Sequence, residues 1–387
     1  MATYYCDPEN HTGTASDSVG GGTTAGNAYV ELDYAVNDIN VTHGKVNSDT
    51  VKVIGTYAPS VVQSNALTSA IAVYGNYFRI MSDGATAFGT QSPTSMATMS
   101  GANSLGKITN STGLNYLTVD GFNCTGYVGG TYLFQAGAAF SFKNNFCDMA
   151  GILSQPRVAA GRVGWIACNN YIKATDVTTG GSILGSYSYH KIIGNYVHLN
   201  NNSTTIGATL HVSGANAVNL WAHNIILLEG TASGFSANAS GVQMVGNTIV
   251  GATKVGQSGI IGWNTFNGLT CTNNHFENLY QGFGGVNNGA STSYGVVSTD
   301  NTYFNVDFMD TPNTDYTRTW DLPSANIARN INLGSSGVTN AATGDLRTAQ
   351  NRRGKSAMNS MNLPMAWAQS LTSGAGIQAP TQYKPFG

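Results

Sequence analysis

Residues 192–197 read Ile192-Ile193-Gly194-Asn195-Tyr196-Val197, and a version of this phrase returns about once every 25 residues through the middle of the chain. Each version has an asparagine with a mainly hydrophobic residue three places before it and another two places after it. The asparagines are Asn145, Asn170, Asn195, Asn224, Asn247, Asn274 and Asn301, at spacings of 25, 25, 29, 23, 27 and 27 residues. Self-similarity at such a period indicates a solenoid, so the chain is predicted to form one continuous body of stacked coils.

The composition favours an all-β solenoid. Charged residues make up only 9% of the chain, whereas hydrophobic residues reach 41% and include 19 Tyr and 14 Phe. A disordered chain lacks large apolar residues, so disorder is excluded. Aromatic and β-branched residues fit strands, and the 48 Gly together with frequent Asn fit tight turns. A formal net charge of −2 argues against a nucleic-acid partner.

Side-chain alternation along a strand assigns the columns of the repeat, numbered from the asparagine as position 0. Position +2 is mainly apolar and is predicted to point inward, as is position −3, while positions +1 and +3 are predicted to point outward. Position +2 holds Cys147, Ile172, Val197, Ile226, Ile249, Phe276 and Tyr303. Position −3 holds Phe142, Ala167, Ile192, Trp221, Met244, Cys271 and Ser298.

The asparagines themselves are predicted to form a ladder. Each side-chain amide can bond the amides of the coils above and below and satisfy backbone groups that the turn leaves unpaired. Asparagine also tolerates the left-handed backbone that such a turn needs. We therefore interpret these residues as structural and not as a catalytic amide array.

The repeat resembles that of the right-handed parallel β-helix proteins, the pectin-lyase-like superfamily that includes bacteriophage tailspikes. The opening Tyr4-Tyr5-Cys6-Asp7-Pro8, followed by a Gly/Thr loop and a short predicted helix, is similar to the usual N-terminal cap of that family. The resemblance covers residues 3–311 and implies the fold. It implies no single activity, because β-helix proteins include lyases, hydrolases, adhesins and structural parts.

Three regions are predicted: residues 1–95 as an N-terminal cap and first coils, residues 96–311 as β-helix repeats, and residues 312–387 as a tail without repeats. Early strands are expected at 3–6, 51–54 and 71–74. Asn27 is expected to begin a helix whose apolar face covers the open end of the first coil.

The tail is the basic part of the chain. Residues 312–387 hold seven Lys and Arg against three Asp and Glu, a net charge of +4, while the remaining residues carry −6. This asymmetry suggests attachment to an acidic surface, although a solvated tail fits equally well. The tail is expected to cap the last coil or to reach a neighbour. The candidate anchoring residues are Arg347, Arg352, Arg353 and Lys355.

Motifs for cofactors, metals and membranes are absent from the sequence. Residues 20–25 match a dinucleotide-binding glycine pattern, but no βαβ unit surrounds them, so no cofactor is predicted. The five cysteines include no C-x-x-C pair and are expected to be mostly buried thiols. The sequence shows no signal peptide and no apolar run long enough for a membrane span.

The strongest candidate for catalysis is the outward +3 column of three successive coils, Asp148, Lys173 and His198. Neighbouring members are expected to lie ~4.8 Å apart, which is close enough for acid–base partnership. Arg157 and Arg162, in the intervening loop, could approach the same face. An ordinary surface pair of an acid and a lysine is the competing interpretation.

Position +1 offers candidate contacts for sugar rings in Tyr171, Tyr196 and His275. These side chains could instead form an aromatic ladder that stabilises the sheet.

These observations favour a structural protein on a bacteriophage particle, either a tail spike or fibre component or a capsid decoration, made in the host cytoplasm. The resemblance implies a homotrimer that contacts other virion proteins, and host-surface polysaccharide is a further candidate partner. Two alternatives remain: a polysaccharide lyase or glycoside hydrolase that uses the Asp148 column, and a non-catalytic glycan-binding adhesin.

Overall fold

The structure is a computed structural model. It describes residues 2–10, 13–43, 50–57, 78–82, 98–100, 108–109, 117–125, 134–138, 141–148, 159–164, 166–177, 182–188, 190–201, 207–213, 219–238, 241–254, 257–262, 268–285, 292–293, 297–309, 319–320, 326–328, 330–333, 338–340 and 345–348.

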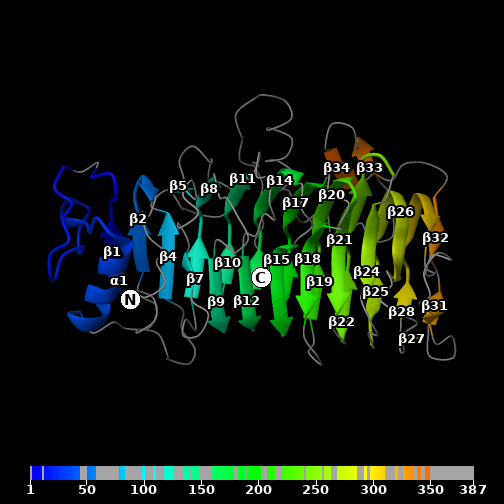
Figure 1. Cartoon of the computed structure of the whole chain (residues 1–387), viewed down its shortest axis with the longest axis horizontal. Coiled ribbons are helices and arrows are strands. Elements are labelled where there is room, and N and C mark those ends of the chain that lie inside the picture. The colour runs from blue at the N-terminus through cyan, green and yellow to red at the C-terminus, as the bar shows by residue number, and fades with distance from the viewer. Residues whose placement is uncertain are drawn as a thin grey trace.

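The described strands stack into an elongated parallel β-solenoid (Figure 1). One sheet, here sheet A, has 12 strands, and each strand pairs in parallel with its equivalents in the coils before and after it. Its strands are β1 (Thr3–Cys6), β2 (Thr50–Val53), β4 (Phe78–Ser82), β7 (Leu117–Asp120), β10 (Ser141–Lys143), β13 (Ile166–Cys168), β16 (Lys191–Ile193), β19 (Asn219–Ala222), β22 (Val242–Val245), β25 (Thr270–Thr272), β28 (Val297–Thr299) and β31 (Asn326–Ala328).

The second sheet, sheet B, has 18 strands in two columns that meet in the long strand β26 (His275–Gly285). The column that follows each ladder asparagine contains β3 (Thr56–Tyr57), β5 (Thr98–Ser100), β8 (Asn123–Thr125), β11 (Phe146–Asp148), β14 (Tyr171–Val177), β17 (Tyr196–Asn201), β20 (Ile225–Gly230), β23 (Thr248–Gly251), β29 (Thr302–Phe308) and β32 (Ile331–Asn332). The other column contains β6 (Ile108–Thr109), β9 (Phe134–Ala138), β12 (Ala159–Val163), β15 (Ser182–Ser188), β18 (Gly207–Ser213), β21 (Ala232–Asn238) and β24 (Ser258–Gly262).

Two small sheets complete the described strands. β27 (Thr292–Ser293) pairs in parallel with β30 (Thr319–Trp320), and β33 (Val338–Asn340) pairs in antiparallel fashion with β34 (Asp345–Thr348).

The interior of the coils confirms the two predicted inward columns. Every residue at positions +2 and −3 of the seven coils is at most 3% exposed. A column of three glycines, Gly234, Gly259 and Gly282, makes room for side chains at position +2. A Cβ atom on Gly259 would lie 2.5 Å from the Gly282 carbonyl oxygen and 2.6 Å from the Phe276 ring. Only glycine fits this position, because the core is already filled by the aromatic ring.

The N-terminal helix forms later in the chain than predicted. Asn27 ends a short 3₁₀ helix (Ala25–Asn27), where its Oδ1 accepts a hydrogen bond from the Thr24 backbone N–H at 2.7 Å. The predicted role of Asn27 as the N-cap of the helix is wrong, because its side chain is already used in this turn. Helix α1 instead spans Leu32–Val41, with Glu31 as its N-cap residue.

Helix α1 lies beside β1 at one end of the solenoid (Figure 1). Its Leu32, Ala35 and Ile39 side chains are at most 2% exposed and belong to the same apolar cluster as Val51 and Val53 of β2. The strands predicted at 3–6 and 51–54 form within one residue, while the strand predicted at 71–74 lies outside the described residues. No helix in the described part of the chain is long and apolar enough to cross a membrane.

The solenoid continues past residue 311, where the sequence repeat was predicted to end. β31 pairs in parallel with β28, and β32 pairs in parallel with β29. Asn330 takes position 0 of this further coil, because its Oδ1 accepts the Asn301 backbone N–H at 2.8 Å. The prediction missed this coil because Asn332, and not an apolar residue, stands at position +2.

Candidate functional site

The asparagine ladder is present and each rung is bonded in the same way. At Asn195, for example, Oδ1 accepts from the backbone N–H of Asn170 at 3.1 Å and from its Nδ2 at 2.9 Å. The Nδ2 of Asn195 then donates to Asn224 Oδ1 at 3.0 Å and to the Ala167 carbonyl at 3.0 Å. The seven predicted side chains are at most 1% exposed, and with every amide used internally they offer nothing to a substrate.

The left-handed residue of each turn is not the ladder asparagine but the residue before it. Position −1 has a positive φ in all seven predicted coils, and its residue types are Asn, Gly, His and Asp, which tolerate that region best. The residues are Asn144, Asn169, Gly194, His223, Gly246, Asn273 and Asp300, with φ between 56° and 68°. The sequence interpretation had assigned this conformation to position 0.

Position +1 is buried and not exposed as predicted. Tyr171 and Tyr196 are each 3% exposed, and so is His275. The rings of Phe146 and Tyr171 stack with centroids 4.7 Å apart, and those of Tyr171 and Tyr196 stack at 5.0 Å. Burial raises the pKa of both tyrosine hydroxyls above the ordinary range. The two tyrosines therefore form an aromatic ladder and leave no ring face for a sugar.

His275 belongs to a buried polar group of its own. Its Nδ1 lies 2.9 Å from Thr302 Oγ1, and its Nε2 lies 2.9 Å from Glu277 Oε2. The side chains of His275 and Glu277 are 4% exposed. Two groups buried to this extent can satisfy each other, but neither reaches a substrate in this arrangement.

The three predicted catalytic candidates are brought together in register. Asp148 of β11 lies opposite Lys173 of β14, and Lys173 lies opposite His198 of β17. All three side chains are half-buried. His198 extends the row to a fourth member, because its Nε2 lies 3.1 Å from Oε1 of Glu229 on β20. These four residues are here called the charged row.

Glu229 is the member that sequence reasoning missed. It stands at position +5 of its coil, which has the same parity as His198 at +3, so alternation puts both on one face. The predicted column contained position +3 alone. An extension of it to all odd positions would have found this carboxylate.

The electrostatics of the row keep Glu229 ionised. The hydrogen bond from His198 lowers the pKa of the Glu229 carboxyl below its ordinary value, and the charges of His198 and Lys173 act in the same direction. Partial burial opposes the shift without reversing it. With a side chain 33% exposed, Glu229 presents a fixed negative charge beside a lysine.

The side chains of the remaining candidates are not described. Arg162 lies in β12, but its side chain is not described, and Arg157 lies outside the described residues. Arg347 lies in β34, and Arg352, Arg353 and Lys355 lie outside the described residues.

The thiols and the glycine-rich loop have structural roles. None of the five cysteines, all of which are described, forms a disulfide, and burial raises the pKa of Cys147 and of Cys168, the latter to about 11. Gly20, in the loop that matched a dinucleotide pattern, donates its N–H to Asp38 Oδ2 at 2.7 Å. The described residues contain no group of three or more His, Cys, Asp or Glu that could hold a metal ion.

Comparison with known proteins gives distant matches in structure only. No protein-family model matches the chain. No curated protein matches it either. A rhamnogalacturonan lyase matches with a TM-score of 0.39 and 12% identity over 92% of this chain and 94% of that chain.

Two further solved structures match at similar distance. A mannuronic acid specific polysaccharide family 6 lyase from human gut microbiota has a TM-score of 0.36 and 12% identity over 87% of this chain and 92% of that chain. A GH136 lacto-N-biosidase from Eubacterium ramulus has a TM-score of 0.32 and 8% identity over 86% of this chain and 67% of that chain. At this distance the matches carry no argument about activity. The chain resembles these proteins as a parallel β-solenoid.

Proposed function

We propose that the protein is a non-catalytic structural β-solenoid of a bacteriophage particle surface that contacts an anionic host glycan through the charged row. One observation carries the glycan contact: Lys173, His198 and Glu229 converge on one outward face and remain partly open to solvent. The other histidine–carboxylate pair in the body of the solenoid, His275 and Glu277, is 4% exposed and closed to a ligand.

The charge state of the row favours binding over cleavage. A glycoside hydrolase needs a carboxylic acid whose pKa is raised, so that it still holds a proton at neutral pH. The pKa of Glu229 moves in the opposite direction. An ionised carboxylate paired with His198 suits the acceptance of hydrogen bonds from sugar hydroxyls, while Lys173 suits a sugar carboxylate.

The affinity of one such site is expected to be low, because partly exposed ion pairs contribute about 0–1 kcal/mol each. A particle that displays many copies would compensate by multivalency, since linked sites bind together far more tightly than one site alone. Because one site binds weakly, we propose that the glycan contact belongs to a protein present in many copies on the particle surface.

The oligomeric state that we propose rests on the sequence. We place the chain in a homotrimer that contacts other virion proteins, with α1 as the cover of the first coil. The support for α1 is the burial of Leu32, Ala35 and Ile39 in the apolar cluster at this end. The low charge of the chain and its similarity to tailspike repeats support the location.

A polysaccharide lyase is the second candidate. Its support is the same row, in which Lys173 and His198 are positioned as bases beside carboxylates. A lyase would use one of them to remove a proton next to a sugar carboxyl group.

The test measures binding and cleavage on the same samples. Purified full-length protein is incubated with a panel of anionic and neutral bacterial surface polysaccharides, and binding is followed by calorimetry. We expect an anionic polysaccharide to bind and Lys173→Ala and His198→Ala each to weaken binding severalfold. Lys191→Ala, at an exposed lysine of β16 in sheet A, is the matched control.

Two results would overturn the proposal. If the wild type binds no polysaccharide on the panel, or if Lys191→Ala weakens binding as much as Lys173→Ala, the row is not a glycan site. If the polysaccharide is shortened by the wild type and left intact by Lys173→Ala, the protein is the lyase of the second candidate.

A further inference from the structure

The two ends of the chain carry net charges of opposite sign, and the body between them has no net charge. Residues 1–43 contain six Asp and Glu and no Lys or Arg. Residues 44–311 contain ten of each kind and are neutral. Residues 349–387 contain four Lys and Arg and no Asp or Glu. We call residues 1–43 the acidic end and residues 349–387 the basic tail.

The acidic end also carries the exposed apolar side chains. Val19 is 75% exposed and Val41 is 72% exposed, and they are the only large hydrophobic side chains exposed to this degree among the described residues. Exposed apolar side chains can contribute to contact with another molecule.

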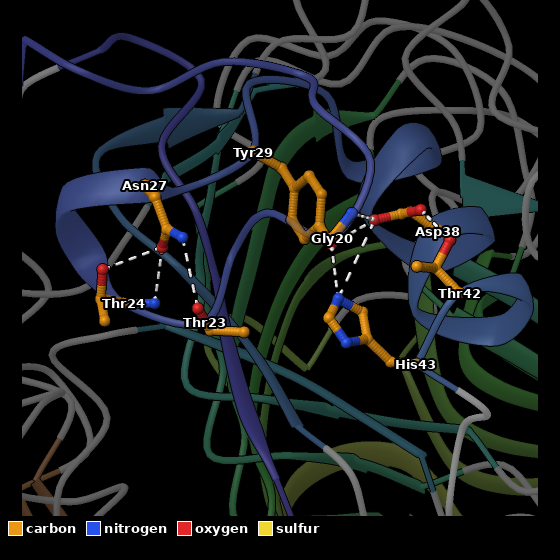
Figure 2. A network of polar contacts seen from close by, with 8 residues as sticks. All are labelled: Gly20, Thr23, Thr24, Asn27, Tyr29, Asp38, Thr42 and His43. Atoms are coloured by element: carbon orange, nitrogen blue, oxygen red, sulfur yellow. Dashed lines mark hydrogen bonds and ion pairs between the residues drawn. The ribbon is translucent and has the colours of Figure 1, made fainter.

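A buried carboxylate joins the loop that contains Val19 to the end of the helix that contains Val41. Asp38 Oδ2 accepts the Gly20 N–H at 2.7 Å and the Tyr29 hydroxyl at 2.7 Å, and Asp38 Oδ1 accepts the Thr42 hydroxyl at 2.5 Å. Figure 2 shows Asp38 between Gly20, which follows Val19, and Thr42, which follows Val41. The loop and the end of α1 are thereby fixed relative to each other.

Exposed acids lie on the same segments. Asp17 Oδ1 accepts the backbone N–H of Glu31 at 3.1 Å, which ties the loop that carries Val19 to the start of α1. Asp17 and Glu31 are both exposed, and Glu31 makes no side-chain capping bond to its helix. The loop and helix α1, which carry these exposed valines and acids, are therefore held together by hydrogen bonds.

We propose that the acidic end is a docking surface for the basic tail of a second copy of this chain. Charge complementarity selects the occupant, because the acidic end contains no Lys or Arg and the basic tail contains no Asp or Glu. The tail also supplies apolar side chains for the two valines, among them Leu363, Trp367 and Leu371.

The contact joins two different surfaces, so it is heterologous. Such contacts form a closed ring or an open row of molecules according to the rotation between neighbours. It is independent of the charged row, so loss of glycan binding leaves this proposal standing.

The experiment measures self-association of the full chain by light scattering after size-exclusion chromatography, in about 50 mM and about 500 mM salt. We expect the wild type to associate in a concentration-dependent manner in low salt and less in high salt, because screening weakens charge pairing. Glu31→Lys and Val41→Ser together are expected to weaken association about tenfold, equivalent to ~1.4 kcal/mol. Gln243→Lys, at an exposed residue of β22, is the control and should associate as the wild type does.

A charge exchange distinguishes the proposed occupant from others. Arg352→Glu with Arg353→Glu should also prevent self-association, and a mixture of this variant with Glu31→Lys should restore it. A wild type that stays monomeric at every salt and protein concentration would overturn the proposal. So would association that the Glu31 and Arg352 variants leave unchanged, or a mixture that fails to associate.

Discussion

The asparagine ladder and the charged row belong to the same coils but differ in how they vary from coil to coil. Position 0 holds asparagine in eight consecutive coils. From Asn145 to Asn274, each asparagine donates its side-chain amide to the side-chain oxygen of the asparagine in the next coil. The row holds an aspartate, a lysine, a histidine and a glutamate, each in a different coil. Identity along the stack therefore identifies side chains that serve stacking. Variation at an outward position marks the side chains that we propose to contact a ligand.

Replacement of a ladder residue should have the largest effect on stability. Asn195→Ala removes the acceptor for the Asn170 N–H and the donor to Asn224. Because these groups stay buried, the free energy of unfolding should fall by about 3 kcal/mol. Chemical denaturation measures it. Asn273→Gly, at an exposed residue with φ of 56°, is the control and should change stability by less than about 0.5 kcal/mol. Equal effects of the two variants would contradict the ladder's role.

A buried histidine makes the interior of the solenoid sensitive to acid. His190 accepts a hydrogen bond from Trp221 Nε1 at 2.7 Å, and burial lowers its pKa from 6.5 to about 3. The unfolded chain binds a proton below pH 6.5, but the folded chain does not until about pH 3. The stability from this group is therefore complete above pH 6.5 and decreases as the pH falls toward 3.

Calorimetric melting between pH 7 and pH 4 measures this dependence. His190→Gln keeps an acceptor for the Trp221 N–H but does not titrate, so its melting temperature should decrease less over the same range. An identical pH dependence in the variant would assign the acid sensitivity to other groups.

Overpacking of the core tests the interior without a change in polarity. Gly259→Ala places a methyl group against the Phe276 ring and the Gly282 carbonyl. We expect a loss of about 1–3 kcal/mol, measured by chemical denaturation. Gly26→Ala is the matched control, because a Cβ atom on Gly26 would have no neighbouring atom closer than 3.9 Å. Its free energy of unfolding should change by no more than about 0.5 kcal/mol. A stable Gly259→Ala protein would show that this part of the core can shift.

The smallest effect on stability is expected in the charged row. His198→Ala removes the partner of Glu229, but the pair is partly exposed and such pairs contribute about 0–1 kcal/mol. Glu229 has a lowered pKa, so its contribution is present above the ordinary carboxyl pKa and is lost as the pH falls below it. Denaturation of wild type and variant at pH 7 and at pH 3 measures both. A large loss at pH 7 would make His198 a structural residue.

Much of the fold could be predicted because each coil needs apolar residues at the same inward positions and an asparagine at the same turn. The period gave the solenoid, and alternation placed Ile172 at +2 and Ala167 at −3 in the interior. The further coil around Asn330 was missed because its inward position +2 holds a polar residue. The helix start was misplaced because Asn27 can bond a turn as readily as a helix, and local pattern does not distinguish the two.

The site was less predictable because burial on the outer face depends on what lies over it. Alternation correctly put Lys173 and His198 on one face but could not show that Tyr171 and Tyr196 are covered. The contact between His198 and Glu229 also depends on a strand that extends beyond position +3, and the repeat phrase does not contain these positions.

The uniform bonding of the ladder has a consequence for how such a protein changes over evolution. A whole coil is a module whose upper and lower faces have the same amide geometry, so a duplicated or deleted coil re-forms the ladder with its new neighbours. The length of the molecule can then change in steps of ~4.8 Å, while the acidic end and the charged row keep their own chemistry.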